Sequence, residues 1–154
     1  MCPKCRKIGT VSGKGRLVSC ECGFSVSFNE YGSFEPAEPF ENVYEWDKWQ
    51  SANILPENAD QDTELFSDGE LTLREIHADH SEELLCTGTA RMFRSRLTVG
   101  EQVFSLRDIQ MMALVQKKAL LFSADGKYYE LKAKNTACMR KYLTVWNKIK
   151  NAAV

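Results

Sequence analysis

The sequence predicts a mainly β protein in two parts: a small cysteine-rich N-terminal unit, and a larger antiparallel barrel capped by one C-terminal helix. Three observations predict this class. Four of the six cysteines lie in the first 22 residues. Seven short apolar segments separated by turn residues follow residue 70, and the final segment changes from a period of 2 to a period of 3.6.

The N-terminal segment, residues 1–34, is expected to form two short hairpins. A strand precedes a turn at Ser12 to Gly15, the next strand covers Arg16 to Ser19, and Ser25 to Phe28 alternates as a third. This segment has too few apolar residues to fold unaided.

Residues 35–69 read as an acidic connector that carries three of the four prolines. Val43, Trp46 and either Trp49 or Gln50 recur at helical spacing, which predicts one short helix. The stretch from Pro56 to Gly69 is typical of a linker or loop.

Residues 70–154 predict seven strands and one helix. Gly100-Glu101 and Asp125-Gly126 mark two of the hairpin turns. Asn135 or Thr136 can cap a helix with one apolar stripe of Met139, Leu143, Trp146 and Ile149. A meander of seven strands with one amphipathic helix is the arrangement of a pleckstrin-homology-like barrel. The expected strands are Leu71 to Ile76, Leu84 to Phe93, Arg96 to Val99, Gln102 to Leu106, Met112 to Lys117, Ala119 to Ala124 and Lys127 to Ala133.

The cysteines Cys2, Cys5, Cys20 and Cys22 are the candidate metal ligands. Two pairs separated by a loop are typical of a zinc ribbon, in which a structural zinc ion replaces the missing core. The second pair has one intervening residue in place of two, and Ser19 stands where the regular spacing puts the third cysteine. A bulge in the preceding strand could absorb that shift. The alternative is a degraded ribbon without metal, held by strand pairing alone.

The remaining histidines and cysteines do not indicate a catalytic site. His77 and His80 lie in a polar turn, where histidines are mostly solvated. Cys86 and Cys138 are expected to be small core residues. A disulfide scaffold is disfavoured because four cysteines crowd together and no secretion signal follows Met1.

Charge divides unevenly along the chain. The count is 6 Lys and Arg against 12 Asp and Glu up to Gly69, and 14 against 9 after it. The basic excess after Gly69 fits an anionic partner, such as phospholipid headgroups or nucleic acid, and it equally fits an ordinary solvated surface. The candidate headgroup-binding residues lie at two turns of the expected barrel; they are Arg91, Arg94, Arg96, Lys117 and Lys118.

The longest apolar runs are too short to span a bilayer. We therefore expect a soluble chain in the cytoplasm, or at the inner face of the cytoplasmic membrane if the basic residues bind headgroups.

Several pieces taken in order resemble one known arrangement. CPKC, CECGF, NEYGSFE, PFENVYEWDKWQ, GTARMFRSRLTVGEQVFSLRDI, ALLFSADGKYYELKAK and RKYLTVWNKI are similar to the C-terminal extension of bacterial lysophosphatidic acid (1-acylglycerol-3-phosphate) acyltransferases of the Clostridia and their relatives. The resemblance covers essentially the whole chain. It implies a zinc-ribbon-like segment followed by a PH/GRAM-like domain, attached to a membrane-associated acyltransferase domain of the same polypeptide.

The acyltransferase signature of that family, a histidine with an aspartate five positions later, does not occur here. His77 has Glu82 at that offset, and His80 has Leu85. The resemblance therefore implies a non-catalytic accessory region of a phospholipid-synthesising enzyme, for membrane positioning, regulation or protein contact. The alternative is a free-standing zinc-ribbon adaptor that binds a protein or nucleic acid. Nucleic acid is the less favoured partner, because the acidic connector would repel phosphates.

Overall fold

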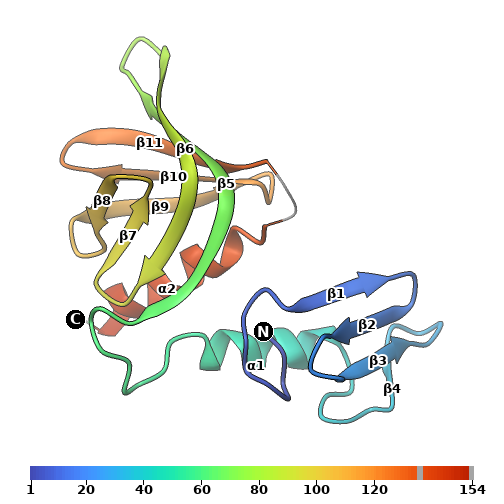
Figure 1. Ribbon diagram of the computed structural model, residues 1–154. Coiled ribbons are helices and arrows are strands. Elements are labelled where there is room, and N and C mark those ends of the chain that lie inside the picture. The colour runs from blue at the N-terminus through green and yellow to red at the C-terminus, as the bar shows by residue number, and fades with distance from the viewer. Residues whose placement is uncertain (135–136, 153–154) are drawn as a thin grey trace. The chain divides into compact units, whose positions relative to one another are not determined.

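The computed structural model describes residues 1–134 and 137–152. It confirms the predicted class: the chain is mainly β, with a small cysteine-bearing unit followed by a PH-like seven-stranded antiparallel barrel and a C-terminal helix (Figure 1). The chain divides into two compact units, Met1–Ile54 and Leu55–Val154. The sequence predicted a separate connector at residues 35–69. In the structure, the helix of that segment belongs to the first unit, and its residues from Leu55 onward belong to the second.

The first unit contains a four-stranded antiparallel sheet and one helix. The β1–β2 turn is shorter than predicted, because β1 continues to Lys14 and only the Gly15 and Arg16 pair turns the chain. Gly15 has φ +62°, a conformation that glycine adopts without strain. In sheet order, the strands are β1 (Val11–Lys14), β2 (Leu17–Cys20), β3 (Ser25–Phe28) and β4 (Phe34–Glu35), and the helix is α1 (Val43–Asn53).

An aromatic cluster around Trp46 forms the core of this unit. Val26, Phe34 and Trp46 are buried, and Phe34 meets the Trp46 ring edge-on with 5.6 Å between centroids. Phe40 stacks on the same indole at 6.1 Å. Trp46 also donates a hydrogen bond from Nε1 to the Met1 carbonyl oxygen at 3.0 Å. The helix thus supplies the apolar surface that the hairpins lack.

Helix α1 begins where the sequence predicts a helix. Asn42 is the N-cap residue, and its side-chain oxygen accepts a hydrogen bond from the Glu45 amide at 3.0 Å. This satisfies one of the amide groups that the first turn leaves without a helical partner.

The second unit forms one seven-stranded sheet in the order β8, β7, β6, β5, β11, β10, β9. Each of the seven predicted strands is present, with ends that shift by a few residues. The strands are β5 (Glu64–Ile76), β6 (Glu82–Phe93), β7 (Arg96–Val99), β8 (Gln102–Ser105), β9 (Ile109–Val115), β10 (Ala119–Ala124) and β11 (Lys127–Ala133).

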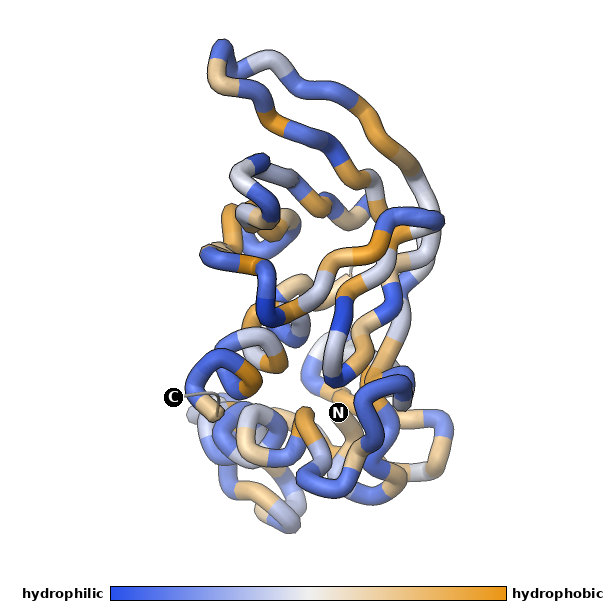
Figure 2. Tube along the Cα trace, turned by 90° about the vertical axis from the view of Figure 1, so that its left-hand side faces the viewer, coloured by the Kyte–Doolittle hydropathy of each residue, from blue (hydrophilic) through white to orange (hydrophobic). Residues whose placement is uncertain are grey.

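The largest difference concerns the predicted loop from Pro56 to Gly69, because β5 begins at Glu64. Its register with β6 shifts between Asp68 and Leu71, and Glu70 has φ +59°. Gly69 and Glu70 therefore form a bulge inside a long strand, and Asp68 is the paired residue before it, so this stretch is not a loop. β5 and β6 continue into a hairpin whose outer end extends past the neighbouring strands (Figure 1), with orange and blue stretches alternating along it (Figure 2).

Helix α2 (Arg140–Ala152) follows the last strand and packs on the sheet next to β9. Met139, Tyr142 and Val145 are fully buried. Leu143, Trp146 and Ile149, which the sequence placed on the apolar stripe with Met139, are only half-buried. The inward face is thus rotated from the predicted one, because Tyr142 and Val145 occupy it. The predicted cap residues, Asn135 and Thr136, lie outside the described residues.

The tight hairpin between β10 and β11 has the predicted form. Asp125 and Gly126 both have positive φ, at +53° and +75°, as a type I′ turn requires. Three aromatic side chains of the second unit pack together near this hairpin. Phe104 meets Phe122 edge-on with 5.0 Å between ring centroids, and Phe122 stacks on Tyr129 with 5.2 Å between centroids.

Candidate metal centre and basic residues

Two tight loops of the first unit carry the four N-terminal cysteines. In the first loop, the Arg6 amide donates to the Cys2 carbonyl oxygen at 3.0 Å, and Arg6 has φ +63°. In the second loop, the Gly23 amide donates to the Cys20 carbonyl oxygen at 3.0 Å, and Gly23 has φ +85°. Both loops therefore reverse the chain within a few residues and turn their cysteines toward each other.

The four thiols converge on one point. Cys2 Sγ lies 3.5 Å from Cys22 Sγ, and Cys5 Sγ lies 3.8 Å from Cys20 Sγ. All four sulfur atoms lie within 4.8 Å of one another. Cys2 and Cys20 are buried, whereas Cys5 and Cys22 are half-buried. Four converging sulfurs on two loops are a donor set that can hold one metal ion.

The short spacing of the second pair is accommodated without the expected bulge in β2. The register of β2 with β1 and β3 is continuous, and Ser19 pairs with Ser12 and Ser25. Cys20 is instead the last residue of the strand, and its amide bonds the Phe24 carbonyl oxygen at 2.9 Å. The loop closed by this bond carries Cys22 back to the other thiols.

Local hydrogen bonds and burial act on the thiols in opposite directions. The hydrogen bond from the Cys22 amide, together with Thr10, lowers the pKa of Cys20 to about 6. The Lys7 amide lowers the pKa of Cys5. Burial raises the pKa of Cys2 to about 11. Amide donors thus favour the thiolate form that metals bind, while the buried Cys2 thiolate needs a cation beside it.

Thr10 is a contributor that the sequence pattern did not reveal. Its Oγ1 lies 3.2 Å from Cys20 Sγ. Because Thr10 precedes β1 and Cys20 ends β2, the pairing of Val11 with Cys20 brings them together. Only the register of the β1–β2 pair would have identified Thr10 as a neighbour of the Cys20 thiol.

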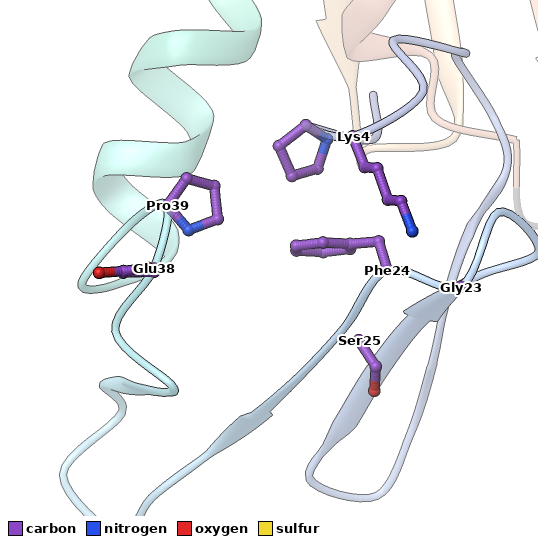
Figure 3. Close-up of a pocket in the computed structure, with 7 residues that line it drawn as sticks. Lys4, Gly23, Phe24, Ser25, Glu38 and Pro39 are labelled. Atoms are coloured by element: carbon purple, nitrogen blue, oxygen red, sulfur yellow. The ribbon is translucent and has the colours of Figure 1, made fainter.

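The two cysteine loops also border a cavity of about 620 Å³ in the first unit (Figure 3). Phe24 points across the cavity toward Pro39, and Lys4 lies on the Phe24 side. Glu38 directs its carboxylate away from the space. The walls are therefore mainly apolar rings, and the loop that carries Cys2 and Cys5 supplies Pro3 and Lys4 to them.

The three predicted headgroup-binding arginines lie near the β6–β7 turn, and each has a partner in the segment before or at the start of β5. Arg91 pairs with Glu64 at 3.2 Å, and Arg96 pairs with Asp62. Arg94 Nη1 donates to three main-chain carbonyl oxygens at 2.8 to 3.2 Å, those of Pro56, Glu57 and Ala59. These arginines hold residues 56–64 against the barrel.

The other two predicted headgroup-binding residues, Lys117 and Lys118, lie at the β9–β10 turn, and both are exposed. Lys117 has φ +62°, which fits a tight turn. The headgroup-binding role of all five basic residues stays a prediction.

The remaining reactive residues take up varied positions. His77 lies between two carboxylates, with Nε2 3.4 Å from Glu83 and Nδ1 3.7 Å from Glu75. Cys86 is half-buried, and burial raises its pKa. Cys138 is exposed, so its predicted place in the core is wrong.

No family model and no curated protein sequence matches the chain. Within residues 1–134 and 137–152, the structure contains no helix that is both long and apolar enough to cross a bilayer.

Proposed function

We propose that the chain is a non-catalytic accessory region of a glycerolipid acyltransferase, in which a zinc-stabilised ribbon accompanies a PH-like domain. The convergence of four cysteine sulfurs supports the zinc-ribbon part of the proposal, and the acyltransferase part depends on the sequence resemblance. Zinc held by four thiolates at about 2.3 Å in a tetrahedron places the sulfurs about 3.8 Å apart. The Cys5 to Cys20 distance of 3.8 Å and the Cys2 to Cys22 distance of 3.5 Å fit this ion.

Four protein thiolates complete the coordination of zinc and leave no position for water or substrate. Such an ion acts by stabilising the fold. The resemblance to the acyltransferase extension supports the choice of parent enzyme. Its most specific piece, EWDKWQ, forms part of α1 and supplies Trp46 to the core of the ribbon unit.

Two measurements on the protein test the proposal. Elemental analysis of the protein purified without chelator should find about one zinc per chain. An antibody against this chain, used on extracts of the source organism, should detect a polypeptide larger by about 200 residues, the size of one further domain. That polypeptide should separate with the membrane fraction. A band at the 17.5 kDa of this sequence alone would contradict the acyltransferase parent.

The alternative is a free-standing adaptor that binds nucleic acid through the ribbon. It is favoured by the charge of residues 1–34, which carry 5 Lys and Arg against 2 Asp and Glu. A shift in electrophoretic mobility of RNA or DNA that disappears with added salt would support it. The Arg16→Gln variant should then bind more weakly, since Arg16 is exposed in this unit.

A further inference from the structure

A second cavity, of about 440 Å³, lies in the PH-like unit, at the end of the barrel where α2 terminates. Four segments of the chain meet there: the segment before β5, the β6–β7 turn, the β8–β9 turn and the last turn of α2. A direct bond joins two of them, because Lys150 Nζ donates to the Arg107 carbonyl oxygen at 2.7 Å. The lining residues are Leu55, Gln61, Arg94, Ser95, Leu106, Arg107, Ile149, Lys150 and Ala152.

Among the described residues, the charge of this lining has one sign. Arg94, Arg107 and Lys150 are cationic, and no Asp or Glu is among the described residues that line the cavity. Three cations around one space repel each other, and an anion placed between them removes that repulsion. The cavity therefore favours an anion with more than one negative charge.

The cations also differ in how firmly they are held. The bonds from Arg94 Nη1 to three carbonyl oxygens fix one end of its guanidinium group. Its remaining guanidinium nitrogens, and the exposed Arg107 side chain, have no partner among the described residues. Both groups can donate to a ligand, and Arg donors match the oxygens of a phosphate in pairs.

The rest of the wall is apolar. Leu106 is fully buried and forms part of the floor, whereas Leu55 and Ile149 are half-buried beside the cations. Inorganic phosphate would leave Leu55 and Ile149 in contact with water. A phosphate ester with an apolar group would cover both side chains, and removing apolar surface from water favours binding.

We infer that this cavity binds a phosphate monoester that carries an apolar chain, with the phosphate between Arg94, Arg107 and Lys150 and the chain against Leu55 and Ile149. A monoester phosphate carries nearly two charges at neutral pH and three acceptor oxygens, which suits three cationic side chains. The site is made of second-unit residues alone, so it depends neither on the metal centre nor on the acyltransferase parent.

The binding experiment uses the full chain loaded with zinc and follows its backbone amides by NMR. The probe is decyl phosphate below its micelle concentration. Inorganic phosphate tests the anion alone, and decyl maltoside tests the apolar chain alone. We expect decyl phosphate to shift the amides of residues 94–95, 106–107 and 149–152, and to bind at least tenfold more tightly than inorganic phosphate. Equal shifts with decyl maltoside would overturn the inference.

Two variants test the residues. Arg107→Gln removes an exposed cation of the cavity, and we expect it to weaken decyl phosphate binding about tenfold. Lys132→Gln is the matched control, because Lys132 is an exposed cation of β11 that does not line the cavity. Equal losses in both variants would show general charge attraction and overturn the site. Thermal melts of both variants verify that they fold.

Vesicles of phosphatidylcholine with 10% phosphatidic acid, a test composition, distinguish the source of the phosphate ester. If the ligand is a membrane lipid, the protein should bind these vesicles, and Arg107→Gln should weaken the binding. If the ligand is a soluble ester, decyl phosphate should bind while the vesicles do not. Vesicle binding that is lost in a Lys117→Gln and Lys118→Gln double variant but kept in Arg107→Gln would place headgroup recognition at the β9–β10 turn, and contradict the inference for lipids.

Discussion

Tyr142, near the start of α2, donates its hydroxyl proton to the Asp68 carboxylate of β5 over 2.7 Å. The Lys141 ammonium lies 2.7 Å from the same carboxylate, and the two charged side chains are only 9% and 15% exposed. The Tyr142 ring also meets Phe66 edge-on at 4.9 Å. Asp68, the residue before the β5 bulge, thus points its carboxylate at the helix. Lys141 balances its charge, and Tyr142 donates a hydrogen bond to it.

Removing Asp68 should destabilise the barrel strongly. In Asp68→Ala, the nearly buried Lys141 ammonium loses its counter-ion, and we expect the free energy of unfolding to fall by about 3 to 5 kcal/mol. Urea titration followed by NMR signals of the second unit measures it. Asp108→Ala is the control, because Asp108 is exposed; its change should stay within about 0.5 kcal/mol. A loss below about 1 kcal/mol in Asp68→Ala would show that the ion pair does not anchor the helix.

Alkaline pH should weaken the same contact. Burial first, and then the hydrogen bond to Asp68, raise the pKa of Tyr142 above its ordinary value. As the pH rises, the unfolded chain therefore loses the tyrosine proton before the folded chain does. The contribution of the Tyr142 hydroxyl to stability is complete below about pH 10 and declines progressively above it. Tyr142 contributes a fall in the free energy of unfolding of about 1.4 kcal/mol for each pH unit above 10.

Tyr142→Phe should remove that contribution. Burial also raises the pKa of Tyr129, so both proteins lose stability, but the variant should lose less per pH unit. The measurement is the urea midpoint at several pH values between 9 and 11. Identical slopes would contradict a buried, neutral hydroxyl at Tyr142.

Arg94 should hold the segment that precedes β5. Its bonds to the carbonyl oxygens of Pro56, Glu57 and Ala59 are replaced by water in Arg94→Gln. We expect hydrogen exchange of amides 57–63 to accelerate about tenfold, equivalent to about 1.4 kcal/mol, while amides of β10 keep their rates. Arg91→Gln removes an exposed pair with Glu64 and should change exchange much less. Unchanged rates in Arg94→Gln would show that contacts other than the Arg94 bonds order this segment.

Metal removal should affect only one of the two units. The first unit has one small aromatic cluster besides its four cysteines, so chelation should abolish its melting transition. The second unit has its own core and should keep its midpoint within about 2 °C. Calorimetry with and without a zinc chelator measures both transitions.

Cysteine variants make the same test specific. Cys22→Ser should lose zinc and the first transition, whereas Cys138→Ser should keep both, because Cys138 is an exposed thiol outside the cluster. Loss of both transitions on chelation would show that the second unit needs the metal as well.

The sequence predicted most strands because their signals are local. Alternating apolar residues and the Asp125-Gly126 pair act within a few residues of chain. The start of β5 was missed because the strand contains a bulge at Gly69 and Glu70, directly after Asp68. Asp and Gly are also residue types that form turns.

Sites were predictable only where spacing in the sequence determines them. The four cysteines met this condition, but the manner in which Cys22 reaches the others depends on where β2 ends. The sequence predicted Arg94 as a cation available to a headgroup. Its partners are main-chain carbonyl oxygens, which every residue has, so the sequence does not indicate them. Arg107 and Lys150 come together only through the packing of α2, which places positions 43 residues apart at one cavity.

The hydrogen bond from Trp46 to the Met1 carbonyl oxygen has a consequence for protein synthesis. The ribosome makes all four cysteines before Trp46, and they also leave it earlier, by about 1 to 5 seconds at ordinary elongation rates. If the four thiols hold a metal ion, the nascent chain can bind that ion while the indole that completes the core is still absent. Without the metal, the same interval would leave Phe24 and Phe34 uncovered on the growing chain, where chaperones can bind them.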